Sequence, residues 1–138
     1  MKPMSDKVFL DSNILIYSYS KNETEKQVVA RKLITECNSF VSTQVLQELA
    51  NIITKKFNFS YTDAQKVIEE CCQNNSLHVN TENTIMHACD IAQQYGFSFY
   101  DSLIISSAME SGCTILYTED MHHAQKINPN FTIINPFS

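Results

Sequence analysis

The amino-acid sequence predicts an α/β fold with a mainly parallel sheet, in one domain that covers residues 1–138. Short apolar runs alternate with longer segments of helical periodicity along the chain. With 138 residues, 43% of them hydrophobic, the chain is long enough to bury a core of its own. Its two glycines and three prolines leave no stretch with the composition of a linker. A single ordered domain is therefore expected.

Five short apolar runs are the candidate strands, and helical patterns lie between them. In chain order these runs are residues 8–10, 40–41, 77–79, 114–117 and 131–134. Strands that are connected through helices pair in parallel, because the chain has to return to the same end of the sheet. We therefore expect a mainly parallel sheet of about five strands.

The first half of the chain contains the patterns of three helices. Residues 13–37 are expected to form a short helix, a break near residues 21–23, and a second helix. Residues 43–56 are expected to form a third, with Ser42 and Thr43 as suitable N-terminal caps. At about 100° per residue, the apolar side chains of the third helix fall on one stripe. They are Val45, Leu46, Leu49, Ile52 and Ile53.

Three more helices are expected in the second half. The first covers residues 62–72, where Thr62 and Gln65 match a capping box. The next covers residues 82–95 and ends at Gly96, and the last begins near Tyr100 and stops at Gly112. Both glycines thus fall where a left-handed residue commonly ends a helix. The inward side chains of the middle helix are expected to be Ile85, Ala88, Cys89 and Ala92.

The apolar stretches and the cysteines indicate a protein of the reducing cytoplasm. The N-terminal apolar run, residues 8–10, is too short for a signal peptide, and no apolar stretch approaches the roughly 18 residues of a membrane span. The five cysteines are an odd number and show no C-x-x-C spacing, so we expect neither disulfides nor structural zinc. They are Cys37, Cys71, Cys72, Cys89 and Cys113.

The charge is distributed unevenly, although its sum of −5 alone argues against a nucleic-acid partner. Residues 1–66 carry nine Lys/Arg and seven Asp/Glu, whereas residues 67–138 carry one and eight. The cations of the first half are candidates for a positive rim beside an acidic centre, and Lys21, Arg31, Lys55 and Lys56 are the candidate RNA-binding residues. Lys26 and Lys32 belong to the same group. Ordinary solvated helix faces explain these cations equally well.

Two aspartates directly follow candidate strands. Asp11 comes after residues 8–10, and Asp120 comes shortly after residues 114–117. Ligands of open α/β sheets bind at this carboxyl edge of the strands. Asp11 would also suit the N-terminal cap of the next helix. Glu119 competes with Asp120 for the second position, and the local pattern favours Asp120.

Two further acids lie on helices. Asp101 is in the first turn of the last helix, where Ser98 and Asp101 also fit a capping box. Glu48 lies about 100° from the centre of the apolar stripe of its helix, at the border between core and solvent. Capping alone would explain Asp101, and Glu48 by itself would be an ordinary surface glutamate.

Taken together, the four acids indicate a metal site, which no single one of them does. A parallel sheet brings the ends of its strands and the first turns of its helices to one edge. Carboxylates that gather there repel one another unless they are protonated or a cation neutralises them. Ligands that are all oxygen suit hard ions, so the expected cofactor is Mg²⁺ or Mn²⁺.

The order of several short motifs resembles a known family. These are D-S-N at residues 11–13, Q-E-L at 47–49, F-Y-D-S-L-I at 99–104, G-C-T-I-L-Y-T-E-D-M at 112–121 and I-N-P-F at 134–137. Together they resemble the PIN domain, and specifically the VapC-like toxins, over nearly the whole chain. One departure is His122-His123-Ala124, where many relatives carry a glycine, and it concerns only the shape of that loop.

The resemblance implies both a fold and a function. The implied fold is a three-layer α/β/α sandwich, and the implied function is an Mg²⁺- or Mn²⁺-dependent endoribonuclease, the toxin of a toxin–antitoxin pair, that dimerises and is neutralised by a cognate antitoxin. By position, the catalytic and metal-binding acids of the family fall on Asp11, Glu48, Asp101 and Asp120. Asn13 and Thr118 fall on supporting positions.

The hypothesis from the sequence is hydrolysis of RNA phosphodiester bonds by metal-activated water, without a side-chain nucleophile. The alternative is a catalytically inactive PIN-like module for RNA binding or assembly. A phosphoryl-transfer domain of receiver type is disfavoured, because no lysine stands at a candidate strand end. A purely structural role would leave the acids as caps and surface charge.

Overall fold

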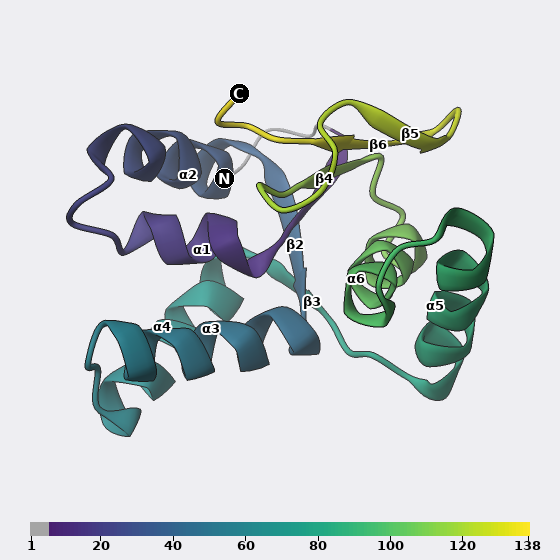
Figure 1. Ribbon diagram of the computed structural model, residues 1–138. Helices are drawn as coiled ribbons and strands as arrows, with labels where there is room; N and C mark the ends of the chain where they lie inside the picture. Colours follow the sequence, from purple (N-terminus) through teal and green to yellow (C-terminus); the bar gives the residue numbers. More distant parts are fainter. Residues whose placement is uncertain (1–5) are drawn as a thin grey trace.

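Strands and helices alternate along residues 6–138, the part of the chain that the computed structural model describes (Figure 1). In chain order the elements are β1 (Lys7–Leu10), α1 (Ser12–Ser18), α2 (Thr24–Glu36), β2 (Asn38–Ser42), α3 (Thr43–Lys56), α4 (Tyr61–Asn74), β3 (Ser76–His78), α5 (Glu82–Tyr95), α6 (Phe99–Glu110), β4 (Ile115–Tyr117), β5 (Gln125–Asn128) and β6 (Phe131–Ile134). The predicted alternation of short strands and helices is confirmed.

The strands form one sheet in the order β3-β2-β1-β4-β6-β5. All neighbouring pairs are parallel except β5 with β6, so the mainly parallel sheet is confirmed. The expected number of about five strands is one too low. The missed strand, β5, has the sequence Q-K-I-N and buries only Ile127. It lies at the sheet edge, where a single inward side chain is enough, and so it has no apolar run to reveal it.

The sheet lies between two layers of helices, which confirms the three-layer sandwich. Helices α1 to α4 cover one face, and α5 and α6 cover the other (Figure 1). The strand order explains this division. From β1 through β2 to β3 the chain steps in one direction, and right-handed crossovers place all the intervening helices on the same face. The chain then returns past β1 to β4, so its crossover helices cover the opposite face.

The core consists of apolar side chains from the sheet and from both helical layers. The largest fully buried ones are Phe9, Phe131, Leu10, Ile14, Leu49, Ile53, Ile104, Ile105, Leu116, Ile133, Val41 and Val45. Helix α6 is buried around much of its circumference, from Ser102 to Ala108. Its polar members, Ser106 and Ser107, hydrogen-bond to the Thr84 carbonyl and the Asn80 side chain. Helix α6 is therefore the most buried helix of its layer.

Two helix predictions need correction. Helix α4 begins at Tyr61, one residue before the expected start, because the hydroxyl of Ser60 accepts the N–H of Asp63 and caps it. In α5 the buried residues are Thr84, Ala88 and Ile91, whereas Ile85 and Cys89 are exposed. The polar Thr84 is buried because its hydroxyl donates to Glu110 of α6. Ala88 is buried and Ala92 half-buried as predicted, so apolar periodicity identified only part of the buried face of this helix.

The remaining helix bounds follow the expected pattern. The break in the first helical region lies between α1 and α2, and α3 covers residues 43–56 as expected, with Ser42 as its cap. No disulfide joins the cysteines of residues 6–138. Cys71 and Cys113 are buried in the core, while Cys72 and Cys89 are exposed, so only part of the set packs as core residues. None of the helices in the described residues is long and apolar enough to cross a membrane.

Both glycines adopt the left-handed conformation that the sequence predicts, each with φ of 77°. A methyl group at Gly96 would meet no atom within 4 Å, so the cost of a side chain there comes from the backbone alone. We expect Gly96→Ala to lower the free energy of unfolding by roughly 1–2 kcal/mol. Urea denaturation measures this directly. Gly96→Asn is the matched control and should cost less, because asparagine tolerates the left-handed region better; equal losses would contradict the backbone explanation.

Candidate metal centre

The candidate centre lies at the carboxyl edge of the sheet, where the chain direction reverses. The strand order places β1 between β2 and β4, so the crossovers from β1 leave toward one side and β4 lies on the other. Such a switch point leaves a crevice beyond the strand ends, in which open α/β sheets bind their ligands. Asp11 follows β1 and residues 118–120 follow β4 at this point. The two strand-end positions that the sequence singled out are therefore neighbours in space.

Asp11 is almost completely buried, with 5% of its surface exposed. It caps α1, and one carboxylate oxygen accepts the N–H of Ser12 at 2.7 Å. The other oxygen accepts the hydroxyl of Thr118 at 2.9 Å. Burial raises the pKa of Asp11 to about 6, although these two hydrogen bonds lower it. The charges of Glu48 and Asp120 are smaller contributions to the same increase in the pKa of Asp11, so Asp11 both caps the helix and belongs to an acidic cluster.

Asn13 connects the start of α1 to the segment after β4. Its Nδ2 donates to Thr118 Oγ1 at 3.2 Å and to Asp120 Oδ2 at 3.0 Å. Its Oδ1 accepts the backbone N–H of Glu119 at 3.2 Å. Thr118 Oγ1 also accepts the N–H of Asp120 at 3.2 Å. Asn13 and Thr118 therefore fix Asp120 relative to Asp11.

Glu48 and Asp101 approach from the helices on the two faces of the sheet. Glu48 of α3 is partly buried, and burial raises its pKa, while the side chains of Ser12 and Gln44 lower it. Its Oε1 is buried without a hydrogen-bond partner. Asp101, the third residue of α6, donates its N–H to Ser98 Oγ, which is one of the two hydrogen bonds of the predicted capping box. Burial raises the pKa of Asp101 as well, and the Asp120 charge adds to this.

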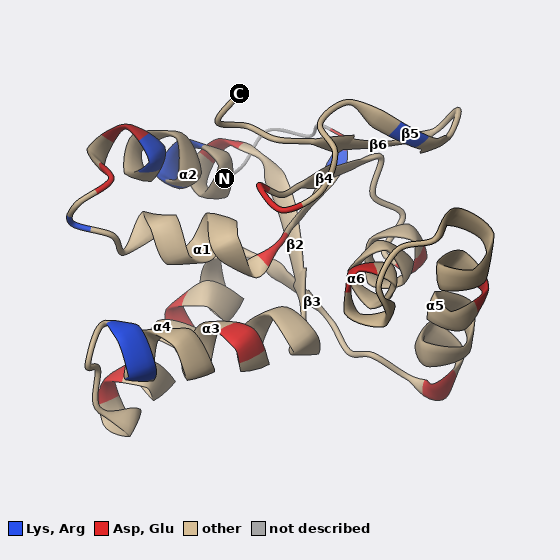
Figure 2. Ribbon diagram, in the orientation of Figure 1, with Lys and Arg blue, Asp and Glu red and all other residues tan. Residues whose placement is uncertain are grey.

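Electrostatic coupling shows that the four acids share one region. The pKa of Glu48 is raised by Asp101 and Asp120, and that of Asp11 by Glu48 and Asp120. In Figure 2 the red segments at the start of α1, in α3, in α6 and after β4 surround the carboxyl edge of the sheet. Even so, in residues 6–138 no three acidic, histidine or cysteine side chains are close enough to enclose an ion directly. The fold gathers Asp11, Glu48, Asp101 and Asp120 into an open arrangement, which we call the acidic ring.

Glu119, the rival of Asp120 in the sequence, is held by other partners. Its carboxylate lies 2.6 Å from Lys26 Nζ and accepts the Tyr17 hydroxyl at 2.7 Å. Burial tends to raise the pKa of Glu119, but these hydrogen bonds lower it overall. Lys26 also lies over the rings of Tyr17 and Phe137, at 4.7 and 5.5 Å from their centroids. Lys26 is thus committed to this network, which also anchors the segment that carries Asp120.

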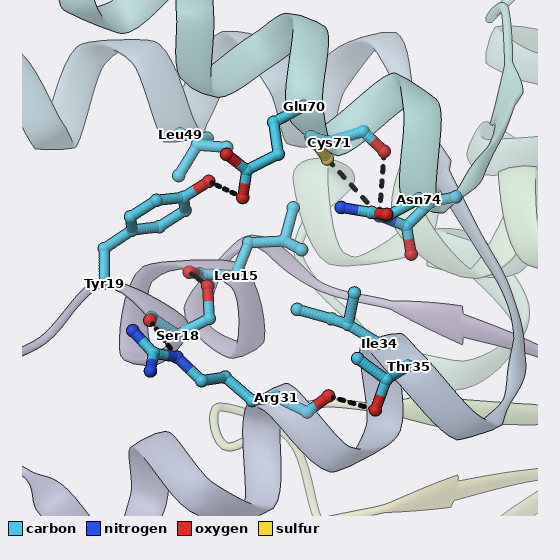
Figure 3. Close-up of a pocket in the computed structure, with 11 residues that line it drawn as sticks. Leu15, Ser18, Tyr19, Arg31, Ile34, Thr35, Leu49, Glu70, Cys71 and Asn74 are labelled. Atoms are coloured by element: carbon cyan, nitrogen blue, oxygen red, sulfur yellow. Dashed lines mark hydrogen bonds between the residues drawn. The ribbon is translucent and has the colours of Figure 1, made fainter.

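The other candidate cations lie away from the acids. Lys21, Lys55 and Lys56 are exposed at the ends of α1 and α3, where Figure 2 shows blue segments at the left. Arg31 is exposed too, and its Nε donates to the Ser18 carbonyl at 3.0 Å. It borders a pocket of about 260 Å³ between α1, α2 and α4, across from Tyr19, whose hydroxyl donates to Glu70 (Figure 3). None of the four acids lines this pocket.

The histidines have separate surroundings. His122 lines an open cavity of about 370 Å³ together with Asp101 and Asp120. His123 Nδ1 accepts the N–H of Asn135 at 2.9 Å. His78 lies 2.9 Å from Glu110, and His87 lies 3.3 Å from the Ser106 hydroxyl, so both make contacts within the fold. His122 is therefore the histidine that shares a cavity with two of the acids.

Sequence reasoning missed two residues beside Glu48. Ser12 and Gln44 both lower the pKa of Glu48, and Gln44 Nε2 also donates to the Tyr100 carbonyl of α6 at 3.3 Å. Gln44 precedes Glu48 by four residues, so helical spacing places the two side chains on one face and could have revealed the contact. Ser12 follows Asp11 directly, and only the packing of α1 against α3 brings it to Glu48.

The fold and the site together define a three-layer α/β protein with a ring of carboxylates at the carboxyl edge of a parallel sheet. This chain belongs to the PIN domain family, whose sequence model matches residues 8–127. Comparison with curated protein sequences gives no match.

Solved structures share this fold. VapC20 from Mycobacterium tuberculosis, a sarcin-ricin loop cleaving toxin, has a TM-score of 0.67 at 13% identity, over 82% of this chain and 89% of that one. A toxin–antitoxin complex from Klebsiella pneumoniae gives 0.69 at 18%, over 94% and 97%. VapBC2 from Rickettsia felis, bound to a promoter DNA fragment, gives 0.65 at 19%, over 92% and 96%. At these identities the likeness establishes the fold.

Proposed function

We propose that this chain is a divalent-metal-dependent endoribonuclease, the toxin of a toxin–antitoxin pair. The observation that carries the proposal is the ring of acids at the switch point of a PIN domain, with Asp11 buried at its base. A fold that buries a carboxylate next to other carboxylates needs a compensating cation or a proton. The test is cleavage of RNA with Mn²⁺ and with EDTA, which also separates the enzyme from an inactive RNA-binding or assembly module.

The donor set fits Mg²⁺ or Mn²⁺. Asp11, Glu48, Asp101 and Asp120 offer only carboxylate oxygens, which hard divalent ions prefer. The buried Oε1 of Glu48 has no hydrogen-bond partner. Buried polar atoms normally have one, and a bound metal ion would provide the missing partner. An open ring also suits Mg²⁺, because this ion keeps several waters and needs only one or two direct carboxylates. A bound ion would polarise the scissile phosphate and make water a nucleophile near neutral pH.

The protein's own residues hold and orient the acids. The hydroxyl of Thr118 donates a hydrogen bond to Asp11 and accepts one from Asn13. Because Asn13 also donates to Asp120, these bonds connect Asp11 with Asp120. Asn13 fixes the direction of the Asp120 carboxylate. The exposed cations Lys21, Arg31, Lys55 and Lys56 are proposed to contact the RNA backbone, since phosphate contacts position a nucleic acid without reading its sequence. No side-chain nucleophile is required.

The proposed partners follow from the same assignment. Related folds occur in toxin–antitoxin complexes, among them those from Klebsiella pneumoniae and Rickettsia felis. We propose that this chain likewise binds a cognate antitoxin, forms a homodimer and acts on RNA in the cytoplasm. Co-expression with the product of an adjacent small gene, followed by size-exclusion chromatography with light scattering, would measure the stoichiometry of the complex.

Thr118→Val should weaken metal binding without unfolding the protein. Valine keeps the shape of the buried side chain but removes the hydroxyl that joins Asp11, Asn13 and the Asp120 N–H. Loss of such an orienting partner typically lowers metal affinity or activity by roughly 10–100-fold. Calorimetric titration with Mn²⁺ measures the affinity. Thr132→Val on β6 is the matched control and should bind Mn²⁺ like the wild type; equal affinities in both variants would contradict the orienting role.

Stabilisation by Mn²⁺ should depend on pH. Because the folded pKa of Asp11 lies above its unfolded value, its contribution to stability is complete at low pH and is lost as the pH rises through about 6. The shift corresponds to about 2–3 kcal/mol when Asp11 is fully ionised. A metal ion binds the ionised form and offsets this cost. We therefore expect Mn²⁺ to raise the melting temperature more at about pH 7.5 than at about pH 5. Differential scanning fluorimetry measures the melting temperature at both pH values. An equal increase with Mn²⁺ at the two pH values would contradict the role of Asp11.

A further inference from the structure

A small aromatic pocket opens at the ends of α1 and α3, away from the acids. We define the aromatic pocket by the residues that line it, which are Tyr19, Ser20, Lys21, Asn22, Phe57 and Phe59. Its volume is about 310 Å³, at the lower end of the roughly 300–1,000 Å³ of small-ligand pockets. Tyr19, Phe57 and Phe59 are each partly buried against the core, so the fold supports the rings that line it.

The turn after α3 holds the two phenylalanines in place. The N–H groups of Phe57 and Phe59 both donate to the Ile53 carbonyl, at 3.2 and 3.1 Å. Asn58 between them has φ of 57°, a left-handed conformation that asparagine tolerates and that commonly ends helices. The ring centroids of Phe57 and Phe59 lie 6.3 Å apart, at an interplanar angle of 55°. The aromatic surface is thus presented by a fixed backbone.

Lysines flank the aromatic pocket, and Glu70, an acid outside its lining, accepts the hydroxyl of Tyr19 at 3.1 Å. Lys21 lines it, and the exposed Lys55 and Lys56 form the last turn of α3 immediately before Phe57. No acidic residue lines it, and Glu23 is the one acid in residues 19–23 and 55–60. Figure 2 shows the blue ends of α3 and of the α1–α2 loop on the same side of the molecule. Aromatic faces beside lysines are the combination that binds unpaired bases and their phosphates.

The aromatic pocket lies at the C-terminal ends of α1 and α3, and two of the acids lie earlier along the same two helices. Helices α1 and α3 pack against each other. Asp11 begins α1 and Tyr19 follows its end, while Glu48 lies in α3 and Phe57 follows its end. At about 1.5 Å rise per residue, the pocket lies roughly 12–14 Å from the acids along each helix. About four nucleotides at the ~3.4 Å spacing of a stacked strand cover that distance.

From this arrangement we propose that the aromatic pocket binds an unpaired base of the RNA strand whose scissile phosphate lies at the acidic ring. A base stacks on Phe57 and Phe59, and Lys21, Lys55 and Lys56 contact the flanking phosphates. The inference rests on the proposed function, because it takes the RNA substrate from there. It adds a binding site outside the acidic ring, which anchors the strand about four nucleotides from the cleavage point.

The test is RNA binding without cleavage. A fluorescein-labelled oligouridine of about 12 nucleotides, within the roughly 4–16 that single-strand binding domains contact, is titrated in EDTA and followed by anisotropy. We expect Phe57→Leu and Phe59→Leu to weaken binding roughly tenfold each, because leucine fills the space but cannot stack. Phe40→Leu, a change of another partly buried phenylalanine on β2, is the matched control and should bind like the wild type.

The lysines are tested by salt dependence. Each phosphate contact contributes about 0.7 to the slope of log affinity against log salt for a single strand. Lys55→Ala with Lys56→Ala should therefore reduce the slope by about 1.4, whereas the phenylalanine variants should leave it unchanged. Lys32→Ala with Lys126→Ala removes the same charge at exposed positions elsewhere and should change the slope less. Melting temperatures near that of the wild type would show that each variant is folded.

Three results would overturn the inference. One is that the wild type fails to bind the oligonucleotide, and another is that the phenylalanine variants bind it as tightly as Phe40→Leu. The third is that these variants lose only a protein partner while RNA binding is unchanged. Because binding is measured in EDTA, pocket-dependent binding without any cleavage in Mn²⁺ would contradict the proposed function alone. If the phenylalanine variants bind and cleave RNA like the wild type, the result would contradict the inference but not the proposed function.

Discussion

Asp101→Asn is expected to reduce RNA cleavage more than a hundredfold while the protein remains folded. Substitution of partners that merely orient a metal ligand already costs 10–100-fold, so loss of a ligand charge should cost more. Asp101 is the clearest position for this test, because its side chain is only partly buried and its backbone cap to Ser98 does not depend on the carboxylate. Cleavage of a labelled RNA with Mn²⁺ measures the rate, and circular dichroism and melting temperature measure the fold.

Asp11→Asn should give the same loss of cleavage but affects the fold as well. Its two oxygens accept from Ser12 and Thr118, and an amide leaves one of these donors unpaired. Asp90→Asn on α5 is the matched control for both variants, because Asp90 is an exposed aspartate away from the ring. It should cleave RNA like the wild type. Full activity of well-folded Asp101→Asn, free of wild-type protein, would remove the assignment of the acidic ring as the metal centre.

Removal of divalent metal should abolish cleavage completely and reversibly. Without a cation, the four carboxylates cannot polarise a phosphate, and their negative charge disfavours a phosphate at the acidic ring itself. After dialysis against EDTA, addition of Mn²⁺ or Mg²⁺ should restore the full rate, whereas wild-type protein left in EDTA should still bind RNA. Calorimetry should detect Mn²⁺ binding to the wild type and to Asp90→Asn, and much weaker binding to Asp101→Asn.

The same titration distinguishes the alternatives. An inactive PIN-like module would bind RNA but show no cleavage at any Mn²⁺ concentration. A purely structural role of the acids would show no Mn²⁺ binding at all. Cleavage that persists in excess EDTA would contradict the metal-dependent mechanism, and pure wild-type preparations are required for this comparison because a contaminating nuclease gives the same signal.

The parallel sheet could be predicted from the sequence because most of its strands bury apolar side chains, β1 on both faces and β6 at alternate positions. The apolar runs at residues 8–10 and 131–134 are visible for this reason. Strand β5 was missed because an edge strand with one inward residue, Ile127, resembles a polar loop. The buried face of α5 was predicted only in part, because Thr84 lies inside and donates a hydrogen bond to Glu110. Periodicity detects apolar burial, but it does not detect a polar side chain whose partner lies on another helix.

The four acids of the candidate site differ in how clearly the sequence indicates them. Strand ends single out Asp11 and Asp120, since the carboxyl edge of a sheet is where ligands bind. Glu48 is unremarkable by local pattern, and only the resemblance to the PIN family pointed to it. Which neighbours share the site depends on packing, so Ser12 and Gln44 were not found. The commitment of Lys26 to Glu119 was not foreseen either, because the two residues are far apart in sequence.

The sequence by itself determined the order of the helices and of every described strand except β5, the left-handed glycines and the chemistry of the acids, because these depend on side-chain type and local spacing. Tertiary structure alone decided that the acids form an open ring, that Glu48 Oε1 lies buried without a partner, and that Phe57 and Phe59 meet Lys21 in one pocket. The physical reason is that hydrogen bonds act over about 3 Å and screened Coulomb interactions over about 10 Å. The packing of the helices on the sheet decides which groups come that close. The sequence does not show this packing.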